Sequence, residues 1–95
     1  MTDQDHLVLV LKDLPVTPGV YLMKNQAEKI IYVGKAKNLK SRVRSYFQDN
    51  KDHSPKTLIL VKQIRQIEHI STKTEVEAFL LEASLIKKHR PKYNI

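Results

Sequence analysis

Cysteine is absent from this 95-residue sequence, and only two of its residues are glycine. The lack of cysteine excludes a disulfide framework, a thiolate zinc site and a thiol nucleophile, and it is compatible with a reducing cytosol and so with a cytoplasmic protein. Two glycines are too few for a glycine-rich loop that cradles phosphates. The four histidines are scattered, without the spacing of metal ligands. The chemistry of this chain therefore has to come from other residue types.

No apolar run approaches the roughly 20 residues that a membrane-spanning helix requires. The apolar content of 41% is still too high for a disordered tail. Residues 6–15 (HLVLVLKDLP) are apolar, but acids precede them and no small-residue cleavage site follows. We interpret them as a first helix or a docking segment rather than a signal peptide. We expect residues 1–95 to form a single domain with one modest core, taken from a longer multidomain chain.

Acidic residues are missing from a long internal stretch of this chain, whose net charge is +7. Between Glu28 and Asp49 there is no acid, while six basic residues fall there: Lys29, Lys35, Lys37, Lys40, Arg42 and Arg44. A second basic cluster, KKHRPKY, occupies residues 87–93. Basic chains of this size favour polyanions, either nucleic acid or an anionic membrane surface. The segregation of charge predicts a one-sided basic surface.

Short apolar segments predict three β-strands. Pro18 and Gly19 are typical of a turn, residues 20–23 and 30–34 are β-rich, and the polar residues 25–29 (NQAEK) between them are typical of a hairpin loop. Residues 67–72 (IEHIST) alternate between apolar and polar side chains and predict a third strand.

Cap signals predict three helices after residue 38. Asn38 precedes a helix over residues 39–48, and Ser54 with Pro55 opens a helix that runs to about residue 66. Thr74 and Glu77 form a capping box for a helix over residues 75–89. The complete order is α-β-β-α-α-β-α, a small α+β domain with a three-stranded antiparallel sheet flanked by helices.

The helix predicted over residues 39–48 has one apolar stripe. Its members recur at i, i+4, i+7 and i+8: Leu39, Val43, Tyr46 and Phe47. This stripe faces the core, so Lys40, Arg42 and Arg44 must line the other faces. Arg42 and Tyr46 lie one turn apart, which by itself is typical of an exposed helix surface.

Glu82 occupies an unusual place in the predicted helix 75–89. A helical wheel shows a broad apolar arc and a second arc on nearly the opposite side: Val76, Phe79, Leu80, Ala83 and Ile86, then Ala78, Leu81 and Leu85. Glu82 lies between the arcs, so its carboxylate should be partly buried and needs a partner. That partner is either an arginine of the basic helix, in a salt bridge, or a hard divalent cation, which oxygen ligands suit.

Tyr21 and Tyr32 lie in the two strands of the predicted hairpin. They form either a cross-strand aromatic pair in a half-buried core or a pair of hydroxyls that point into a polar site. Gly34 either ends the second strand or allows a backbone to approach a ligand closely. Spacing alone leaves these alternatives open.

The tripeptides GVY at residues 19–21 and YVG at residues 32–34 resemble the two-part signature of the GIY-YIG nuclease superfamily. Two longer segments are more specific. YVGKAKNLKSRVRSYF at residues 32–47 and EVEAFLLEASLIKKHRPKYNI at residues 75–95 are similar to the N-terminal domains of the UvrC family, which incise DNA in bacterial nucleotide excision repair. The resemblance covers the chain from about residue 18 to its last residue.

The resemblance implies roles for individual positions. Gly19 and Gly34 belong to the structural motif, and the metal-binding glutamate of the family falls on Glu82, the residue that the helical wheel also distinguishes. The other catalytic positions fall on Tyr21, Tyr32, Lys35, Arg42, Tyr46 and Asn94, the last of which would position groups around the cleft. The remaining basic residues would grip DNA phosphates without reading bases: Lys37, Lys40 and Arg44. The implied cofactor is one divalent cation, Mg²⁺ or Mn²⁺.

The implied reaction is hydrolysis of a DNA phosphodiester on the 3′ side of a lesion. Glu82 would hold the cation, and Arg42 would neutralise charge on the nonbridging oxygens. Tyr21 is the first candidate for the general base and Tyr32 the competing one. Lys35 and metal-bound water would lower the pKa of the phenol, which is about 10 without perturbation.

The implied partners are a damaged DNA duplex, a UvrB-type loading protein and the rest of the same chain, which carries a second nuclease domain for the 5′ cut. Two rival interpretations remain open: a noncatalytic basic module that binds nucleic acid, and a structure-specific nuclease of the same superfamily with another substrate. A binding module needs the lysines but not a half-buried glutamate, because a carboxylate repels phosphate unless a cation lies between them.

Overall fold

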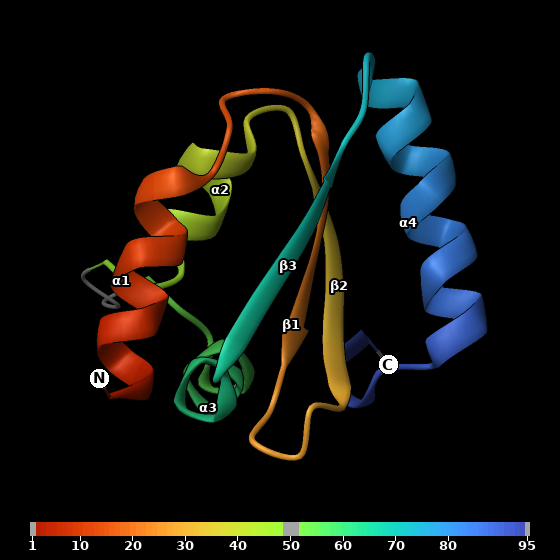
Figure 1. The fold of residues 1–95 in the computed structure, drawn as a ribbon. Helices are drawn as coiled ribbons and strands as arrows, with labels where there is room; N and C mark the ends of the chain where they lie inside the picture. The colour runs from red at the N-terminus through yellow and green to blue at the C-terminus, as the bar shows by residue number, and fades with distance from the viewer. Residues whose placement is uncertain (1, 49–51, 95) are drawn as a thin grey trace.

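A central antiparallel sheet separates two layers of helices (Figure 1). The structure is a computed structural model that describes residues 2–48 and 52–94. Helices α1, α2 and α3 lie on one side of the sheet, and α4 lies on the other (Figure 1). The elements in chain order are α1 (Asp3–Asp13), β1 (Gly19–Lys24), β2 (Ile30–Ala36), α2 (Leu39–Ser45), α3 (Pro55–Gln63), β3 (Gln66–Ser71), α4 (Glu75–His89) and the 3₁₀ turn η1 (Lys92–Asn94).

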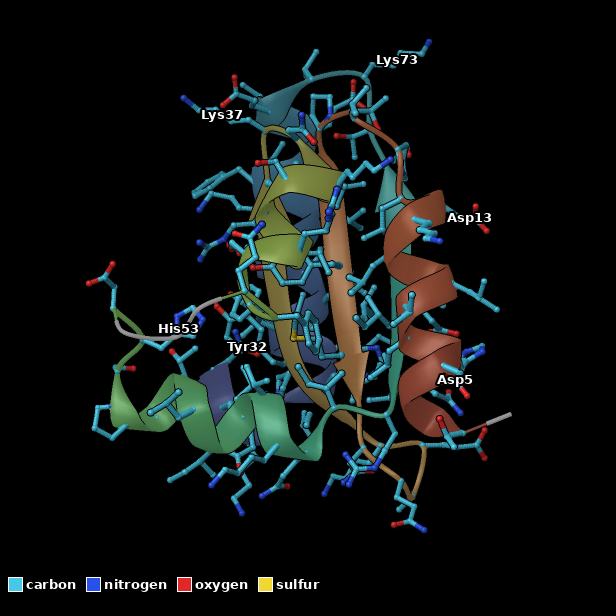
Figure 2. The ribbon with its side chains drawn as sticks, turned by 90° about the vertical axis from the view of Figure 1, so that its left-hand side faces the viewer. Asp5, Asp13, Tyr32, Lys37, His53 and Lys73 are labelled. Carbon is cyan, nitrogen blue, oxygen red and sulfur yellow. The ribbon has the colours of Figure 1, made fainter. Side chains whose placement is uncertain are left out.

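The predicted α+β class and the predicted order of elements are confirmed. Figure 2, turned by 90°, shows α1, α2 and α3 lying over the same face of the sheet. Within the described parts of the chain, no helix is both long enough and apolar enough to cross a membrane.

Strand β1 lies at the centre of the sheet, with β2 and β3 antiparallel to it on its two sides. The predicted hairpin loop is confirmed: the side-chain oxygen of Asn25 accepts hydrogen bonds of 3.0 Å from the backbone N–H groups of Ala27 and Lys29. Both strands are longer than their apolar runs, since pairing begins with Gly19 opposite Ala36. Backbone pairing does not depend on side-chain polarity, so the polar ends of the strands were not predicted.

The three predicted cap residues begin the helices as expected. The side chains of Asn38, Ser54 and Thr74 each accept a hydrogen bond from the backbone N–H three residues later, at 3.0, 3.2 and 3.1 Å. Such caps satisfy backbone donors that have no partner within the helix. The helix starts are therefore a property of the local sequence.

Two helices end three residues earlier than predicted. α2 ends at Ser45, because the N–H groups of Tyr46 and Phe47 donate to carbonyls three residues back and tighten the last turn. α3 ends at Gln63, because the chain then joins the sheet, where the N–H of Arg65 donates to a backbone carbonyl of β1. The predicted end of α4 is confirmed.

Hydrophobic cores lie on both sides of the sheet, because side chains alternate between its faces. The core against α1, α2 and α3 includes Tyr21, Met23, Leu39, Val43 and Leu60. The core against α4 is smaller and is built from Val20, Leu22, Val33 and Ala78. The apolar stripe predicted for α2 is confirmed, since its first two members are completely buried.

α4 packs against the sheet through the smaller of its two apolar arcs. Ala78 is 1% exposed, and Leu81 and Leu85 are partly buried beside it. Most of the broad arc faces outward instead, with Phe79 54% and Leu80 61% exposed, while its last member, Ile86, packs against the core. The small side chain of Ala78 lets the helix approach the sheet closely, which orients Glu82 toward β2.

Candidate active site

Three tyrosine rings gather on the sheet face that α2 covers. Tyr21 lies opposite Gly34 and Tyr32 lies opposite Met23, so the two tyrosines are diagonal neighbours across the β1–β2 pair. Their ring centroids are 6.2 Å apart, which confirms the cross-strand arrangement. Tyr46, directly after α2, places its ring edge-on to both, at 5.8 Å from Tyr21 and 6.3 Å from Tyr32. The helix thus completes a compact aromatic cluster.

Gly34 provides the space in which the Tyr21 ring lies. A Cβ atom at position 34 would overlap the outer end of that ring, including its hydroxyl oxygen. Because β2 continues to Ala36 and neither glycine of the chain has a positive φ, Gly34 neither ends the strand nor serves a special backbone conformation. The glycine is required for close approach, and the approaching group is a side chain of the same chain.

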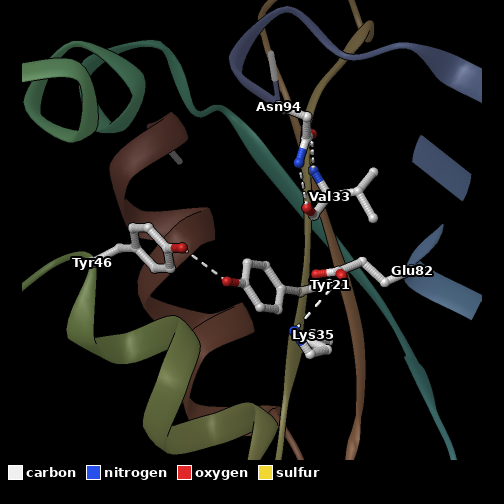
Figure 3. A network of polar contacts seen from close by, with 6 residues as sticks. All are labelled: Tyr21, Val33, Lys35, Tyr46, Glu82 and Asn94. Atoms are coloured by element: carbon white, nitrogen blue, oxygen red, sulfur yellow. Dashed lines mark hydrogen bonds and ion pairs between the residues drawn. The ribbon is translucent and has the colours of Figure 1, made fainter. Parts of the chain in front are cut away.

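The hydroxyl groups of Tyr21 and Tyr46 share a hydrogen bond of 2.8 Å (Figure 3). Arg42, one turn earlier on α2, donates from its guanidinium to the Tyr46 hydroxyl at 3.3 Å and lies 5.1 Å from the centroid of the Tyr46 ring. Arg42 remains exposed to solvent. A permanent positive charge therefore lies beside the phenols at a place that an anionic group can reach.

Burial raises the pKa of all three phenols above its ordinary value. Desolvation is the largest cause in each case; it raises the pKa of Tyr21 and brings the pKa values of Tyr32 and Tyr46 to about 12. The positive charge of Arg42 lowers each of these pKa values in part. Lys35 was expected to act on a tyrosine in this way, but its ammonium group lies beside a carboxylate. Arg42 is the cation that favours the phenolates.

Glu82 projects from α4 toward β2, and its carboxylate lies 3.8 Å from Nζ of Lys35 (Figure 3). Its side chain is 19% exposed, so the predicted partial burial is confirmed. The alternative in which an arginine of α2 forms a salt bridge with Glu82 is wrong. The partner is Lys35, because β2 and not α2 lies beneath this side of α4. Lys35 also lies 5.7 Å from the centroid of the Phe79 ring. Since the lysine side chain is half-exposed, the ion pair contributes little to stability.

The tyrosines and Glu82 approach from opposite faces of the sheet and interact at its edge. β2 is an edge strand, so side chains from both faces can reach the same border. Burial is the main cause of the raised pKa of Tyr32, and the negative charge of Glu82 is a smaller cause that acts in the same direction. The edge of β2 therefore combines phenols, an arginine and a carboxylate in one region.

Asn94 pairs with the outer edge of β2. Its side-chain oxygen accepts a hydrogen bond from the N–H of Val33, and its side-chain nitrogen donates to the Val33 carbonyl, both at 2.8 Å (Figure 3). The amide thus takes the place of one residue of a neighbouring strand. Asn94 holds the strand that carries Tyr32 and Lys35, and both polar atoms of its side chain are used in this contact.

Glu82 is the carboxylate that could hold a metal ion at this edge. In residues 2–48 and 52–94, no three or more His, Cys, Asp and Glu side chains are grouped to bind a metal. A site that takes most of its ligands from the protein does not fit these residues. Mg²⁺ does fit, because it usually keeps several waters and uses only one or two carboxylates.

The three basic residues assigned to phosphate binding separate into two places. Lys40 and Arg44 line one shallow groove along α2, with a volume of about 370 Å³. The side chain of Lys37 is 85% exposed, and its Nζ lies 4.0 Å from Glu75 at the start of α4. Figure 2 shows Lys37 at the same end of the molecule as Lys73. The structure therefore brings two of the three residues together.

A cleft between the tyrosines and α3 was not predicted from the sequence. Its volume is about 190 Å³, and it is lined by Tyr32, Tyr46, Lys56, Thr57, Leu60 and Tyr93. His53, just before α3, stacks on the Tyr46 ring with centroids 6.4 Å apart and an angle of 30° between the rings. Ser54 and Pro55 signalled the start of the helix, but no pattern indicated that its first turn would lie beside the tyrosines.

Known proteins resemble this chain along most of its length. A family model described as the UvrC-like GIY-YIG domain matches residues 17–95. The UvrABC system protein C of Bdellovibrio bacteriovorus is 74% identical over 85 residues, which are 90% of this chain and 14% of that protein. The protein of the same name from Caldicellulosiruptor saccharolyticus is 60% identical with the same coverage. This chain therefore spans only 14% of the length of these relatives.

Solved structures match this chain over its whole length. The GIY-YIG N-terminal endonuclease domain of UvrC from Thermotoga maritima, bound to its catalytic magnesium ion, superposes with a TM-score of 0.84 at 40% identity. The match covers 100% of both chains. The order of elements and the three-stranded sheet are thus those of that domain.

Proposed function

This chain belongs to the family of UvrC-like GIY-YIG domains, and on that basis we propose that it is a divalent-metal-dependent endonuclease domain that hydrolyses a DNA phosphodiester on the 3′ side of a lesion during nucleotide excision repair. The observation that carries the proposal is the placement of Glu82, a partly buried carboxylate beside Lys35 on β2, the strand that also carries Tyr32. A carboxylate at that place opposes phosphate binding unless a cation lies between them.

Glu82 would hold one divalent cation, Mg²⁺ or Mn²⁺, with water in the remaining coordination positions. When bound, the cation supplies a Lewis acid for the scissile phosphate and for the leaving 3′ oxygen. Lys35 balances the charge of the carboxylate and directs it toward β2. Arg42, already oriented by Tyr46, would neutralise the charge that grows on the nonbridging phosphate oxygens.

The exposure of Tyr32 supports it as the general base, in preference to Tyr21, the first candidate from the sequence. The Tyr21 hydroxyl is buried and shares its hydrogen bond with Tyr46. Tyr32 is partly exposed and lines the cleft, where a water molecule can reach it. Its pKa of about 12 is too high for efficient proton transfer near neutrality. Arg42 and the charge of a bound cation would both favour its phenolate.

The proposed substrate is a damaged DNA duplex, whose phosphates Lys37, Lys40 and Arg44 would hold without reading bases. The relatives are named as components of a UvrABC system, which supports a UvrB-type protein as the partner that loads this domain. Because this chain spans 14% of those relatives, a second nuclease domain for the 5′ cut has room elsewhere in the same polypeptide. The reaction would take place in the cytoplasm, where bacterial DNA lies.

The proposal is tested by grafting residues 1–95 into a full-length relative, with its loading partners, Mg²⁺ and a duplex that carries one defined lesion. Glu82→Gln is compared with Glu77→Gln, which removes the same charge from an exposed position of the same helix. We expect Glu82→Gln to abolish the 3′ cut while loading on DNA persists. Glu77→Gln should cut like the native domain.

The alternatives give different results in the same assay. If Glu82→Gln cuts on the 3′ side at the native rate, the assignment of Glu82 as the metal ligand fails. If the native graft is loaded on DNA but makes no 3′ cut, a noncatalytic module that binds DNA is indicated. If the native graft cuts branched, undamaged DNA in preference to the lesion, the substrate assignment fails and a structure-specific nuclease is indicated.

A further inference from the structure

The first turns of α3 form one wall of the cleft at the proposed cutting site. The tyrosine wall of this cleft, about 190 Å³ in volume, is made by Tyr32 and Tyr46, and the α3 wall by Lys56, Thr57 and Leu60. If the scissile phosphate of a DNA strand lies at the tyrosines, the next nucleotide of that strand would contact α3.

The start of α3 is held in place by contacts on both sides of Lys56. The Ser54 side chain caps the helix by accepting a hydrogen bond of 3.2 Å from the backbone N–H three residues later. His53 stacks on the Tyr46 ring. Leu60, one turn after Lys56, is 3% exposed within the larger core. Lys56 thus projects from a helix turn whose position relative to the tyrosines is determined by packing.

The cleft has the chemistry of a phosphate subsite. Its polar side chains are the phenols of Tyr32, Tyr46 and Tyr93, the hydroxyl of Thr57 and the ammonium group of Lys56. A lysine ammonium group is a compact charge with three donors, which binds phosphate oxygens without selecting a base. The cleft therefore complements the charge of the DNA backbone.

We propose that Lys56 binds the DNA phosphate next to the scissile one and forms, with Thr57, a second phosphate subsite on the α3 wall of the cleft. The proposal rests on the function proposed above, because the scissile phosphate has to lie near Tyr32 and Glu82. Lys56 positions the strand and takes no part in proton transfer. It is separate from Lys40 and Arg44, which line a different groove along α2.

The test is a scan of uncharged phosphates with the full-length graft. A methylphosphonate replaces one phosphate at a time on each side of the 3′ cut, and single-turnover rates of 3′ incision are measured for the native domain, Lys56→Ala, Lys56→Arg and Lys62→Ala. Lys62 is the matched control, since it is exposed near the far end of α3 and lines a different groove, between α1 and α3.

In the native domain and in Lys62→Ala, one methylphosphonate beside the scissile bond should slow incision about 10- to 100-fold, as expected for a lost hydrogen bond between charged groups. In Lys56→Ala the same replacement should cause no further loss, because the contact is already missing. Lys56→Arg keeps the charge and should keep the native pattern.

Two results would overturn the subsite. The first is that each methylphosphonate slows 3′ incision by Lys56→Ala by the same factor as it slows incision by the native domain. The second is that Lys56→Ala has a lower melting temperature than the native domain and that Lys56→Arg incises as slowly as Lys56→Ala. The role of the lysine would then be structural.

Failure of the proposed function is recognised separately, by the absence of any 3′ cut with the native graft. The role of Lys56 is then tested by the binding of residues 1–95 to a DNA duplex in EDTA. The isolated domain is suitable for this assay, since the Thermotoga maritima domain of matching extent was crystallised by itself. Lys56→Ala should reduce the slope of log affinity against log salt concentration by about 0.9, the value for one phosphate contact. An unchanged slope would contradict the subsite.

Discussion

The two faces of the sheet contribute to the site in different ways. On the α2 face, three phenol rings pack together, Tyr21 is 1% exposed, and its hydroxyl is hydrogen-bonded to that of Tyr46. On the α4 face, Glu82 forms an ion pair of 3.8 Å with a half-exposed lysine. The phenols are therefore preorganised by packing, whereas the carboxylate can exchange Lys35 for another cation without disturbing the core.

The largest expected effect is on the rate of 3′ incision, and it distinguishes Tyr32 from Tyr21 on the α2 face of the sheet. Tyr32→Phe should slow 3′ incision by the graft about 10²- to 10⁴-fold, the range for loss of a general base. Tyr21→Phe should slow it at least tenfold less. It should instead reduce stability by about 0.5–1.5 kcal/mol, because it removes the buried hydrogen bond to Tyr46, whose hydroxyl keeps its contact with Arg42. Single-turnover incision and urea unfolding measure the two effects. A larger rate loss for Tyr21→Phe would return the role of general base to Tyr21.

Gly34→Ala tests whether packing positions the phenols. The added methyl group overlaps the Tyr21 ring, so the variant should lose about 1–3 kcal/mol of stability through overpacking. Urea unfolding of residues 1–95 measures this loss. Ala36→Gly, two residues later on the same strand, is the control and should not displace the Tyr21 ring. If Gly34→Ala leaves both stability and the near-ultraviolet spectrum of the tyrosines unchanged, the ring is not held as described.

High pH should reduce the stability of the domain through the phenols on the α2 face of the sheet. The pKa values of Tyr32 and Tyr46 are raised to about 12 in the folded domain, against about 10 for an unperturbed phenol. A raised pKa means that the fold favours the neutral phenol, so this stability is complete below pH 10 and is lost as the pH rises through 12. The urea concentration at the midpoint of unfolding should therefore decrease as the pH is raised from 9 to 11.5.

The Tyr32→Phe variant is the control for this fall, because it keeps the ring and removes one titrating group. Its midpoint should fall less over the same pH range than that of the native domain. An identical fall would contradict the raised pKa of Tyr32 as a source of the loss of stability.

The smallest expected effect concerns the exposed arc of α4. Leu80→Ala should change the stability of residues 1–95 by less than about 0.5 kcal/mol, since the side chain is 61% exposed. Leu22→Ala removes the same atoms from the core beneath α4, where the side chain is 6% exposed, and should cost about 2–5 kcal/mol. Equal losses in urea unfolding would show that the exposed arc is packed in solution.

Local patterns predicted the helix starts better than the helix ends. Asn38, Ser54 and Thr74 begin their helices because a cap is an interaction between residues three positions apart. The ends of α2 at Ser45 and of α3 at Gln63 were predicted too late, because α2 tightens into a final turn and the chain after α3 pairs with β1. The second cause is a tertiary contact that no short window of sequence contains.

The sequence by itself determined the order of the elements, the buried stripe of α2 and the partial burial of Glu82, because these depend on periodicity and on near neighbours. Only the tertiary structure decided that Lys35 is the partner of Glu82, that α4 packs through Ala78, and that Lys56 lies beside the tyrosines. Each of these contacts joins segments that are far apart in the chain. Their meeting depends on the strand order β2-β1-β3 and on which side of the sheet each helix covers, and local hydrogen bonds and periodicity specify neither.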